Sequence, residues 1–264
     1  MSRGQPWPAP SGPFPPVELP VAGCDRLVLA QNLVALCPLP SFDTSAMDGW
    51  AVSGSGPWTV VGTSLAGRPV PEPLVAGQAV VIATGAAVPP GADAVVRSEE
   101  GRVVAGDGAD LLIAATPEGS TNVRPAGEEC SAGEVLAVAG AVLAPALLGL
   151  AAAAGHDTLS VVPRPRAALV LFGDELATSG VPELGKVRDS LGPQVPAWLA
   201  RLGVEVVAVE VAEDTLAAHV EAMRRAAEVA DVVLTTGGTA AGPVDHLHEA
   251  IADCAGEVLV DSVA

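Results

Sequence analysis

The sequence Ala-Asp-Val-Val-Leu-Thr-Thr-Gly-Gly-Thr-Ala-Ala-Gly-Pro-Val-Asp, from Ala230 to Asp245, decides the fold of the C-terminal part of the chain. Asp231 to Thr235 is a short apolar, β-branched run without helical periodicity, which predicts a buried parallel strand. Gly237 and Gly238 end the strand in a loop, and Val244 to Cys254 has a helical pattern. In open α/β sheets, ligands bind where a strand leads through such a loop into a helix.

The glycine pair and the acidic residue after it are the candidate binding groups of this stretch. Gly237 and Gly238 permit positive φ and close backbone approach, so their N–H groups are free to bind an anion. Asp245 near the helix start is either a solvated residue favoured by the helix dipole or a metal ligand. The loop matches neither the dinucleotide-binding nor the P-loop pattern, so the stretch alone leaves both roles open.

Upstream of this stretch, strands alternate with helices. The predicted strands are Ala167 to Phe172 and Val204 to Val211, the predicted helices are Ser190 to Leu202 and Thr215 to Ala230, and Glu257 to Val260 is a last strand. This alternation predicts an α/β domain with a parallel, doubly wound sheet. The rule for parallel sheets places the acids that follow the strands along one rim. These acids are Asp174, Glu175, Asp214 and Asp245.

Acids that converge at one rim repel one another. Two carboxylates about 6 Å apart repel by roughly 3 kcal/mol at an effective dielectric near 20. Protonation would offset this repulsion by raising pKa values, and a bound Mg²⁺ would offset it because carboxylate oxygens are ligands that Mg²⁺ prefers. Such a metal would hold a phosphorylated or oxyanionic substrate. The alternative is that the acids are spread along the rim and solvated.

The region from Trp58 to Glu134 predicts a small all-β module, because short β-branched runs alternate with Gly and Pro. The runs are Trp58 to Val61, Ala79 to Ala83, Ala94 to Arg97, Arg102 to Ala105 and Leu111 to Ala114. Two polar residues of the module are candidates for binding. Thr84 either caps its own loop or faces a ligand. Arg124 either forms a surface ion pair or contacts a phosphate.

The residues on both sides of this module have less regular patterns. Asp25 to Leu36 has apolar residues at helical spacing, which predicts an early amphipathic helix. Asp48 and Gly49 fit a tight turn. Val135 to Gly155 has no charged residue and about the length of a membrane span, but Gly, Pro and many alanines interrupt it. That pattern favours a strand, a turn and a buried helix with Pro145 in its first turn.

The composition limits the partners of the protein. The 264 residues carry 31 acidic and 13 basic side chains, with a net charge of −18, so neither nucleic acid nor an anionic membrane is an expected partner. The four cysteines form no C-x-x-C pair, so we expect small buried hydrophobic residues in a reducing compartment rather than a zinc site. We therefore expect a soluble, cytoplasmic protein. The cysteines are Cys24, Cys37, Cys130 and Cys254.

Taken together, these motifs resemble the molybdopterin molybdenumtransferase family of the MoeA type, whose members include the C-terminal domain of gephyrin. Five stretches match in family order over nearly the whole chain. They are Phe42 to Val52 (Ser-Ala-Met-Asp-Gly-aromatic-Ala), Thr84 to Val96 (Thr-Gly-x-x-x-Pro-x-Gly-Ala-Asp), Asn122 to Glu128 (Asn-x-Arg-x-x-Gly-Glu), Gly173 to Leu176 (Gly-Asp-Glu-Leu) and Gly237 to Asp245. The first pattern is highly specific.

The resemblance implies an α/β multidomain architecture. Residues 1–22, rich in Pro and Gly, are expected to be a flexible N-terminus, and residues 23–50 with 135–164 a helical or extended linker domain. Residues 51–134 would be the inserted β-rich domain. Residues 165–264 would be a doubly wound molybdopterin-binding-like domain that is shorter at its C-terminus than in the family.

The resemblance also implies the reaction and the residues that serve it. The family inserts molybdate into adenylylated molybdopterin with Mg²⁺ and releases AMP. The carried-over catalytic positions are Asp48, Glu175 and Asp245, the substrate-binding positions are Thr84, Arg124, Gly237, Gly238 and Asp214, and the metal ligands are Glu175, Asp214 and Asp245. A homodimer is implied, in which the β module of one subunit faces the α/β domain of the other.

Several departures from the family pattern keep other functions open. Phe172 replaces a threonine before Gly-Asp-Glu-Leu, Leu191 replaces an asparagine, and the Lys-x-Pro-Gly-Lys-Pro loop is absent from this sequence. The alternative is a catalytically impaired molybdopterin-binding paralogue or scaffold module. A molybdopterin adenylyltransferase shares the α/β domain but lacks the Met-Asp-Gly-Trp module, and a dinucleotide-dependent enzyme would need a phosphate fingerprint that this chain lacks.

Overall fold

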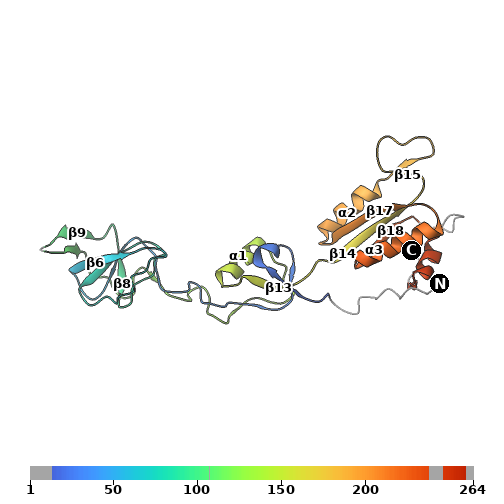
Figure 1. The fold of residues 1–264 in the computed structure, drawn as a ribbon. Helices are drawn as coiled ribbons and strands as arrows, with labels where there is room; N and C mark the ends of the chain where they lie inside the picture. Colours follow the sequence, from blue (N-terminus) through green and yellow to red (C-terminus); the bar gives the residue numbers. More distant parts are fainter. Residues whose placement is uncertain (1–13, 107, 238–245, 260–264) are drawn as a thin grey trace. The chain divides into compact units, whose positions relative to one another are not determined.

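The computed structural model describes residues 14–106, 108–237 and 246–259. The chain folds as two compact units, whose elements are labelled in Figure 1. The first unit, here the α/β unit, contains Ser160 to Ala264 together with Met1–Leu19 and Gly23–Ala30. The second, here the β unit, contains Pro20–Ala22 and Gln31–Leu159.

A six-stranded sheet forms the centre of the β unit, in the order β8-β5-β7-β6-β10-β9. The pair β6–β7 is parallel and the other neighbouring pairs are antiparallel. The strands are β5 (Gly49–Val52), β6 (Trp58–Ser64), β7 (Gln78–Ile82), β8 (Ala94–Arg97), β9 (Arg102–Ala105) and β10 (Asp110–Ile113). All five predicted runs are therefore strands.

The two faces of this sheet bury separate apolar clusters. Val52, Trp58 and Leu112 pack on one face, and Val80 and Val95 pack on the other. Trp58 is fully buried, and its indole N–H donates to the carbonyl oxygens of residues 53 and 54 at 3.1 and 3.2 Å. Each such side chain contributes about 1.5–3 kcal/mol to folding by leaving water. This packing holds the strand ends that carry the candidate residues.

Short strands form three smaller sheets apart from the six-stranded one. β4 (Thr44–Ser45) pairs with β11 (Val123–Arg124), and β3 (Leu33–Val34) pairs with β12 (Val135–Ala137). β2 (Val28–Leu29) and β1 (Val17–Pro20) lie on either side of β13 (Thr158–Val162) in a three-stranded sheet. Part of the predicted flexible N-terminus, residues 1–22, is therefore the strand Val17–Pro20, and a turn of 3₁₀-helix follows at Val21–Gly23.

The predicted helix over Asp25 to Leu36 is wrong. This stretch contains β2 and β3 instead, and Arg26 adopts a positive φ of 60°, which interrupts a helix. Its apolar residues Leu29 and Leu33 are buried because each strand pairs with a distant partner. Long-range strand pairing has overridden the local helical spacing, as tertiary context often does.

The uncharged stretch from Val135 to Gly155 forms the predicted strand, turn and helix. β12 comes first, and α1 (Pro145–Ala153) begins with Pro145 in its first turn. The helix is less buried than expected, because Ala151 is its single buried residue. Among the described residues, no helix has the length and apolar character that crossing a membrane requires.

The α/β unit contains a parallel three-stranded sheet in the order β17-β14-β18. The strands are β14 (Arg166–Phe172), β17 (Glu205–Ala212) and β18 (Val232–Thr236), and the helices are α2 (Leu191–Arg201), α3 (Leu216–Val229) and α4 (Leu247–Asp253). All three strands and the helices Ser190 to Leu202 and Thr215 to Ala230 were predicted. The helix expected over Val244 to Cys254 is confirmed for its described part.

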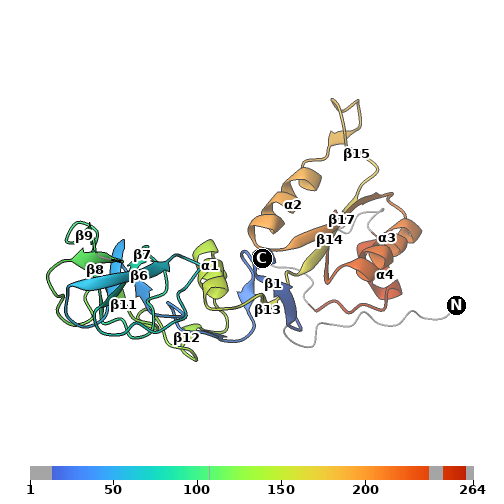
Figure 2. The ribbon, with the colours of Figure 1, turned by 60° about the vertical axis from the view of Figure 1, so that its left-hand side comes forward.

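Helices cover both faces of this sheet. Ala168, Val170 and Phe172 pack with Ala222 and Ala226 of α3 on one face. Leu171 points to the other face, where α2 approaches so closely that a side chain at Gly192 would lie 3.0 Å from it. Figure 2 shows α2 on one side of β14 and β17 and α3 with α4 on the other. The doubly wound arrangement predicted for this domain is thus present in the described residues.

Two further predictions have different outcomes. The last strand, expected over Glu257 to Val260, is absent from its described part, Glu257–Leu259, which pairs with no described strand. An apolar pattern alone does not make a strand, because a strand needs a hydrogen-bonding neighbour. None of the four cysteines, all of which are described, forms a disulfide, and Cys24 and Cys130 are buried. Burial raises the pKa of the Cys24 and Cys254 thiols.

Candidate functional site

Thr84 holds the carboxylate of Asp48. In the antiparallel pair β5–β7, Gly49 lies opposite Ile82, so the loop before β5 meets the loop after β7. Asp48 Oδ1 accepts hydrogen bonds from the backbone N–H of Thr84 at 2.7 Å and from its hydroxyl at 2.9 Å. The backbone N–H, and then the hydroxyl, lower the pKa of Asp48 below its ordinary value of 3.8. Asp48 is therefore a fixed carboxylate, and Thr84 orients it.

Close strand pairing at Gly49, rather than a tight turn, explains why glycine follows Asp48. Asp48 lies in a bend and Gly49 begins β5, where the neighbouring strand β8 comes very close. A Cβ atom at Gly49 would lie 1.9 Å from the carbonyl oxygen of Val96. Glycine is needed here so that β5 and β8 pair directly beside Asp48.

A cavity of about 360 Å³ lies next to this carboxylate. Arg124 lines it because β11 pairs with β4, which places Arg124 opposite Thr44. Arg124 forms half-exposed ion pairs with Glu128 at 3.1 Å and Glu129 at 3.5 Å. Both readings of Arg124 therefore remain, since it forms an ion pair and also lines a cavity. The lining residues are Thr44, Ser45, Ala46, Thr84, Gly85 and Arg124.

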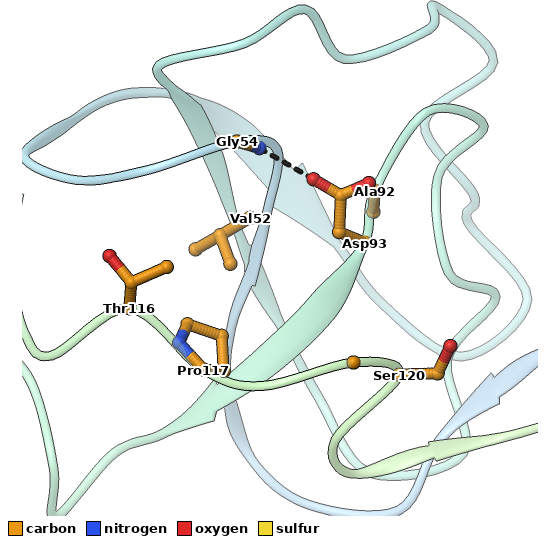
Figure 3. A pocket seen from close by; sticks show the side chains of 8 residues that line it. Val52, Gly54, Ala92, Asp93, Thr116, Pro117 and Ser120 are labelled. Atoms are coloured by element: carbon orange, nitrogen blue, oxygen red, sulfur yellow. Dashed lines mark hydrogen bonds between the residues drawn. The ribbon is translucent and has the colours of Figure 1, made fainter.

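The β unit has a second cavity of about 450 Å³ (Figure 3). Its one charged side chain is Asp93, whose Oδ2 accepts a hydrogen bond from the backbone N–H of Gly54 at 2.6 Å. Figure 3 shows this carboxylate directed at Gly54, with Thr116, Pro117 and Ser120 on the segment that passes beside it. The cavity has a carboxylate and no cation among its lining residues, so it does not suit an anion. Asp93 instead fixes the turn after β5.

The rim of the α/β sheet brings Asp174 and Asp214 together. The backbone N–H of Asp174 donates to Asp214 Oδ2 at 3.1 Å, and the backbone N–H of Asp214 donates to Asp174 Oδ1 at 3.3 Å. This reciprocal pair joins the ends of β14 and β17, as the rule for parallel sheets predicts. The carboxylate of Glu175 folds back over Gly173, since a Cβ atom there would lie 2.6 Å from Glu175 Oε2.

Sequence reasoning missed His219 of α3. Its imidazole is 1% exposed, stacks on Phe172 with ring centroids 3.7 Å apart, and lies 3.6 Å from Asp214. His246 meets it edge-on at 5.9 Å. Phe172, which stands where the family pattern has a threonine, therefore packs against His219. The sequence could have predicted that His219 is buried. Its position lies on the same face of the helix as Ala222 and Ala226.

The glycine loop and the metal ligands are only partly described. Gly237 has a φ of 87°, and a Cβ atom there would lie 3.0 Å from the carbonyl oxygen of Phe172, which confirms positive φ and close backbone approach. Gly238 and Asp245 lie outside the described residues. Within the described ranges, no group of three or more His, Cys, Asp or Glu side chains could hold a metal ion. Glu175 and Asp214 are carboxylates and suit Mg²⁺, but they do not complete a site by themselves.

The structure therefore assembles two separate groups of candidate residues. In the β unit, Asp48, Thr84 and Arg124 gather around the ends of β7 and β11. In the α/β unit, Glu175 and Asp214 lie at the rim with Asp174.

Comparison with known families gives matches over almost the whole chain. Residues 8–155 match the model described as the MoeA N-terminal region (domain I and II), and residues 168–264 match the one described as a probable molybdopterin binding domain.

Individual relatives point in the same direction. Molybdopterin molybdenumtransferase 2 of Mycobacterium tuberculosis is 35% identical over 248 residues, covering 89% of this chain and 60% of that protein. Molybdopterin molybdenumtransferase of Staphylococcus aureus is 32% identical over 249 residues, covering 90% and 58%. The crystal structure of a molybdopterin biosynthesis MoeA protein from Pyrococcus horikoshii superposes with a TM-score of 0.73 at 25% identity, covering 92% of this chain and 63% of that one. The chain spans about three fifths of the length of these relatives.

Proposed function

The chain belongs to the MoeA family of molybdopterin molybdenumtransferases, and on that premise we propose that it acts in molybdenum cofactor biosynthesis. The proposed reaction is the Mg²⁺-dependent insertion of molybdate into adenylylated molybdopterin, with release of AMP. The proposed catalytic residues are Asp48, Glu175 and Asp245.

The observation that carries this proposal is the Asp48–Thr84 pair beside the cavity that Arg124 lines. Two donors keep Asp48 ionised, so its carboxylate is available to accept hydrogen bonds from a bound substrate. Hydroxyl groups and a guanidinium around the cavity are donors that suit an oxyanion. Thr84 and Arg124 are the proposed substrate contacts of the β unit.

The acids of the α/β rim supply the second part of the proposed site. Glu175, Asp214 and Asp245 would hold Mg²⁺, whose charge would be set against the phosphate groups of the substrate. The reciprocal bonds between Asp174 and Asp214 hold the Asp214 carboxylate in place without a metal. Gly237 and Gly238 would offer backbone N–H groups to a phosphate. We also propose that the protein is a homodimer, which analytical ultracentrifugation would test.

Molybdenum insertion by isosteric variants tests the proposal. Asp48→Asn and Glu175→Gln keep the shape of each side chain and remove its charge, so we expect each to lower the rate of AMP release and of molybdenum incorporation at least a hundredfold, the range seen when one catalytic group is removed. Asp110→Asn is the matched control, because Asp110 is an exposed carboxylate on β10.

Two results would count against the proposal. Unchanged turnover in both variants would remove Asp48 and Glu175 from the reaction. A wild-type chain that binds adenylylated molybdopterin but never releases AMP would be a binding module rather than a transferase.

A further inference from the structure

Two basic side chains contact the main chain of the segment that carries Asp174 and Glu175. β15 (Leu176–Ala177) and β16 (Val187–Arg188) form a two-stranded ladder immediately after Glu175. The backbone N–H of Val187 donates to the carbonyl oxygen of Glu175 at 2.8 Å, so the second strand returns to the rim. Lys186 immediately precedes β16 and Arg188 ends it, so the two cations are two positions apart in the chain.

Main-chain oxygens anchor both cations. Lys186 Nζ donates to the carbonyl oxygen of Asp174 at 2.5 Å, and Arg188 Nη1 donates to the carbonyl oxygen of Ala177 at 3.3 Å. Among the described residues, neither cation has a carboxylate oxygen within 4.0 Å. Their positions are therefore fixed while their charges are left without a carboxylate partner.

Such an arrangement favours an anion over a structural ion pair. The chain carries a net charge of −18, and Lys186 is its one lysine. An ammonium has three N–H donors and a guanidinium has five, so one bond to a carbonyl oxygen leaves donors on each side chain for a ligand. A guanidinium and an ammonium two positions apart in the chain offer donors to the oxygens of a phosphate group, which accept charge-assisted hydrogen bonds.

We propose that Lys186 and Arg188 form an oxyanion clamp that binds phosphate groups of the substrate at the rim of the α/β unit. The identity of the phosphorylated substrate rests on the proposed function, whereas the clamp itself rests on the anchoring of the two cations. The clamp supplies positive charge to a phosphate group that binds near the carboxylates of Asp174, Glu175 and Asp214. Lys186 and Arg188 are thus substrate-binding residues in addition to those carried over from the family.

The single lysine makes a direct test possible. Reductive methylation with ¹³C-formaldehyde labels Lys186 and the N-terminal amine, and it preserves the positive charge of both. Inorganic pyrophosphate is the probe, titrated with and without Mg²⁺ and followed by the ¹³C signal. We expect a saturable shift of the Lys186 signal. An unmoved signal at saturating pyrophosphate would overturn the clamp.

Variants show whether the shift reflects binding by these side chains. Each variant loses charge-assisted hydrogen bonds to the ligand. We therefore expect Lys186→Gln and Arg188→Gln each to weaken pyrophosphate binding about tenfold to a hundredfold, as measured by calorimetry. Lys186→Arg retains the charge and should bind within about threefold of the wild type. Arg201→Gln is the matched control, because Arg201 lies over Trp198 at the end of α2. Equal binding by all variants, with only a lower melting temperature for Lys186→Gln, would show a structural tether and overturn the clamp.

Molybdate, added separately, distinguishes the two oxyanions of the proposed reaction. A Lys186 signal that responds to molybdate and not to pyrophosphate overturns the assignment to phosphate. The clamp and the reaction can also fail separately. Pyrophosphate binding that depends on Lys186 in a chain without molybdenum insertion keeps the clamp and overturns the proposed function. Normal insertion and normal pyrophosphate binding by a chain that carries both Lys186→Gln and Arg188→Gln overturn the clamp alone.

Discussion

The two units of this protein fix their candidate carboxylates in different ways. In the β unit, Asp48 accepts two hydrogen bonds from Thr84, a residue brought to it by the register of β5 against β7. In the α/β unit, Asp174 and Asp214 hold each other through their backbone N–H groups at the ends of two parallel strands. The first carboxylate depends on strand register, and the second pair depends on the direction of the strands.

The two arrangements stabilise the negative charge of their carboxylates in different ways. Asp48 is stabilised as an anion by hydrogen bonds alone, which lower its pKa. Asp174 and Asp214 lie close to each other, so their charges repel, and a cation beside them would reduce that repulsion. Lys186 and Arg188 are cations of this chain beside them, and Mg²⁺ is the proposed additional one.

The largest effect on stability is expected where β5 and β8 come closest. Gly49→Ala would place a methyl group against the carbonyl oxygen of Val96, so we expect the β unit to lose about 3 kcal/mol of unfolding free energy. Gly62→Ala on β6 is the control, because the nearest atom to its added methyl group lies 4.0 Å away. Amide hydrogen exchange of β5 and β8 measures the loss, and it should leave β14 unchanged. Equal protection in the two variants would contradict the close contact.

A somewhat smaller effect is expected in the α/β unit. His219→Ala removes a buried ring that stacks on Phe172, which should cost about 2–3 kcal/mol through lost packing. His219→Phe keeps a flat ring and should lose less. Hydrogen exchange of β14 and α3 should report the change while β5 stays protected. A loss shared equally by both units would break the comparison between them.

The smallest effect concerns the pKa of Asp48. Thr84→Val removes the hydroxyl and keeps the backbone N–H, which is the larger cause of the low pKa, so the pKa should rise only part of the way towards 3.8. Because the folded pKa is lowered, the stabilisation from Asp48 is present above about pH 3.8 and is lost as the pH falls through the folded value. Thr84→Val brings the folded pKa closer to 3.8, so the pH range over which this stabilisation is lost becomes narrower.

Carboxyl ¹³C NMR titration of Asp48 measures this shift. Thr63→Val, an exposed threonine on β6, is the control and should leave the titration of Asp48 unchanged. A pKa that is the same in Thr84→Val and the wild type would show that the hydroxyl does not orient this carboxylate.

Much of the fold could be predicted because local patterns agree with the final pairing. β8 and β9 have the predicted boundaries, since β-branched runs end at Gly, Ser or Glu turns. The segment from Asp25 to Leu36 failed for the opposite reason. Its apolar residues follow a helical spacing, but Leu29 and Leu33 are buried where their strands pair with distant parts of the chain. Sequence patterns do not carry that information.

The candidate site could be predicted in part for the same reason. The rim position of Asp174 and Asp214 follows from strand direction, which the alternation of strands and helices reveals. The bond between Asp48 and Thr84 joins residues 36 positions apart and depends on register, so no local pattern shows it. Lys186 is the one lysine of the sequence, but its place beside the main chain of Asp174 depends on a loop that returns to the rim.

The central claim is that Asp48 and Glu175 serve the same reaction. The most direct test is a double-mutant cycle with Asp48→Asn, Glu175→Gln and both together, measured as the rate of molybdenum insertion. Residues that act as a unit are not additive, so the double variant should be about as slow as the slower single variant. Losses that multiply in the double variant, or full activity in either single variant, would contradict the claim.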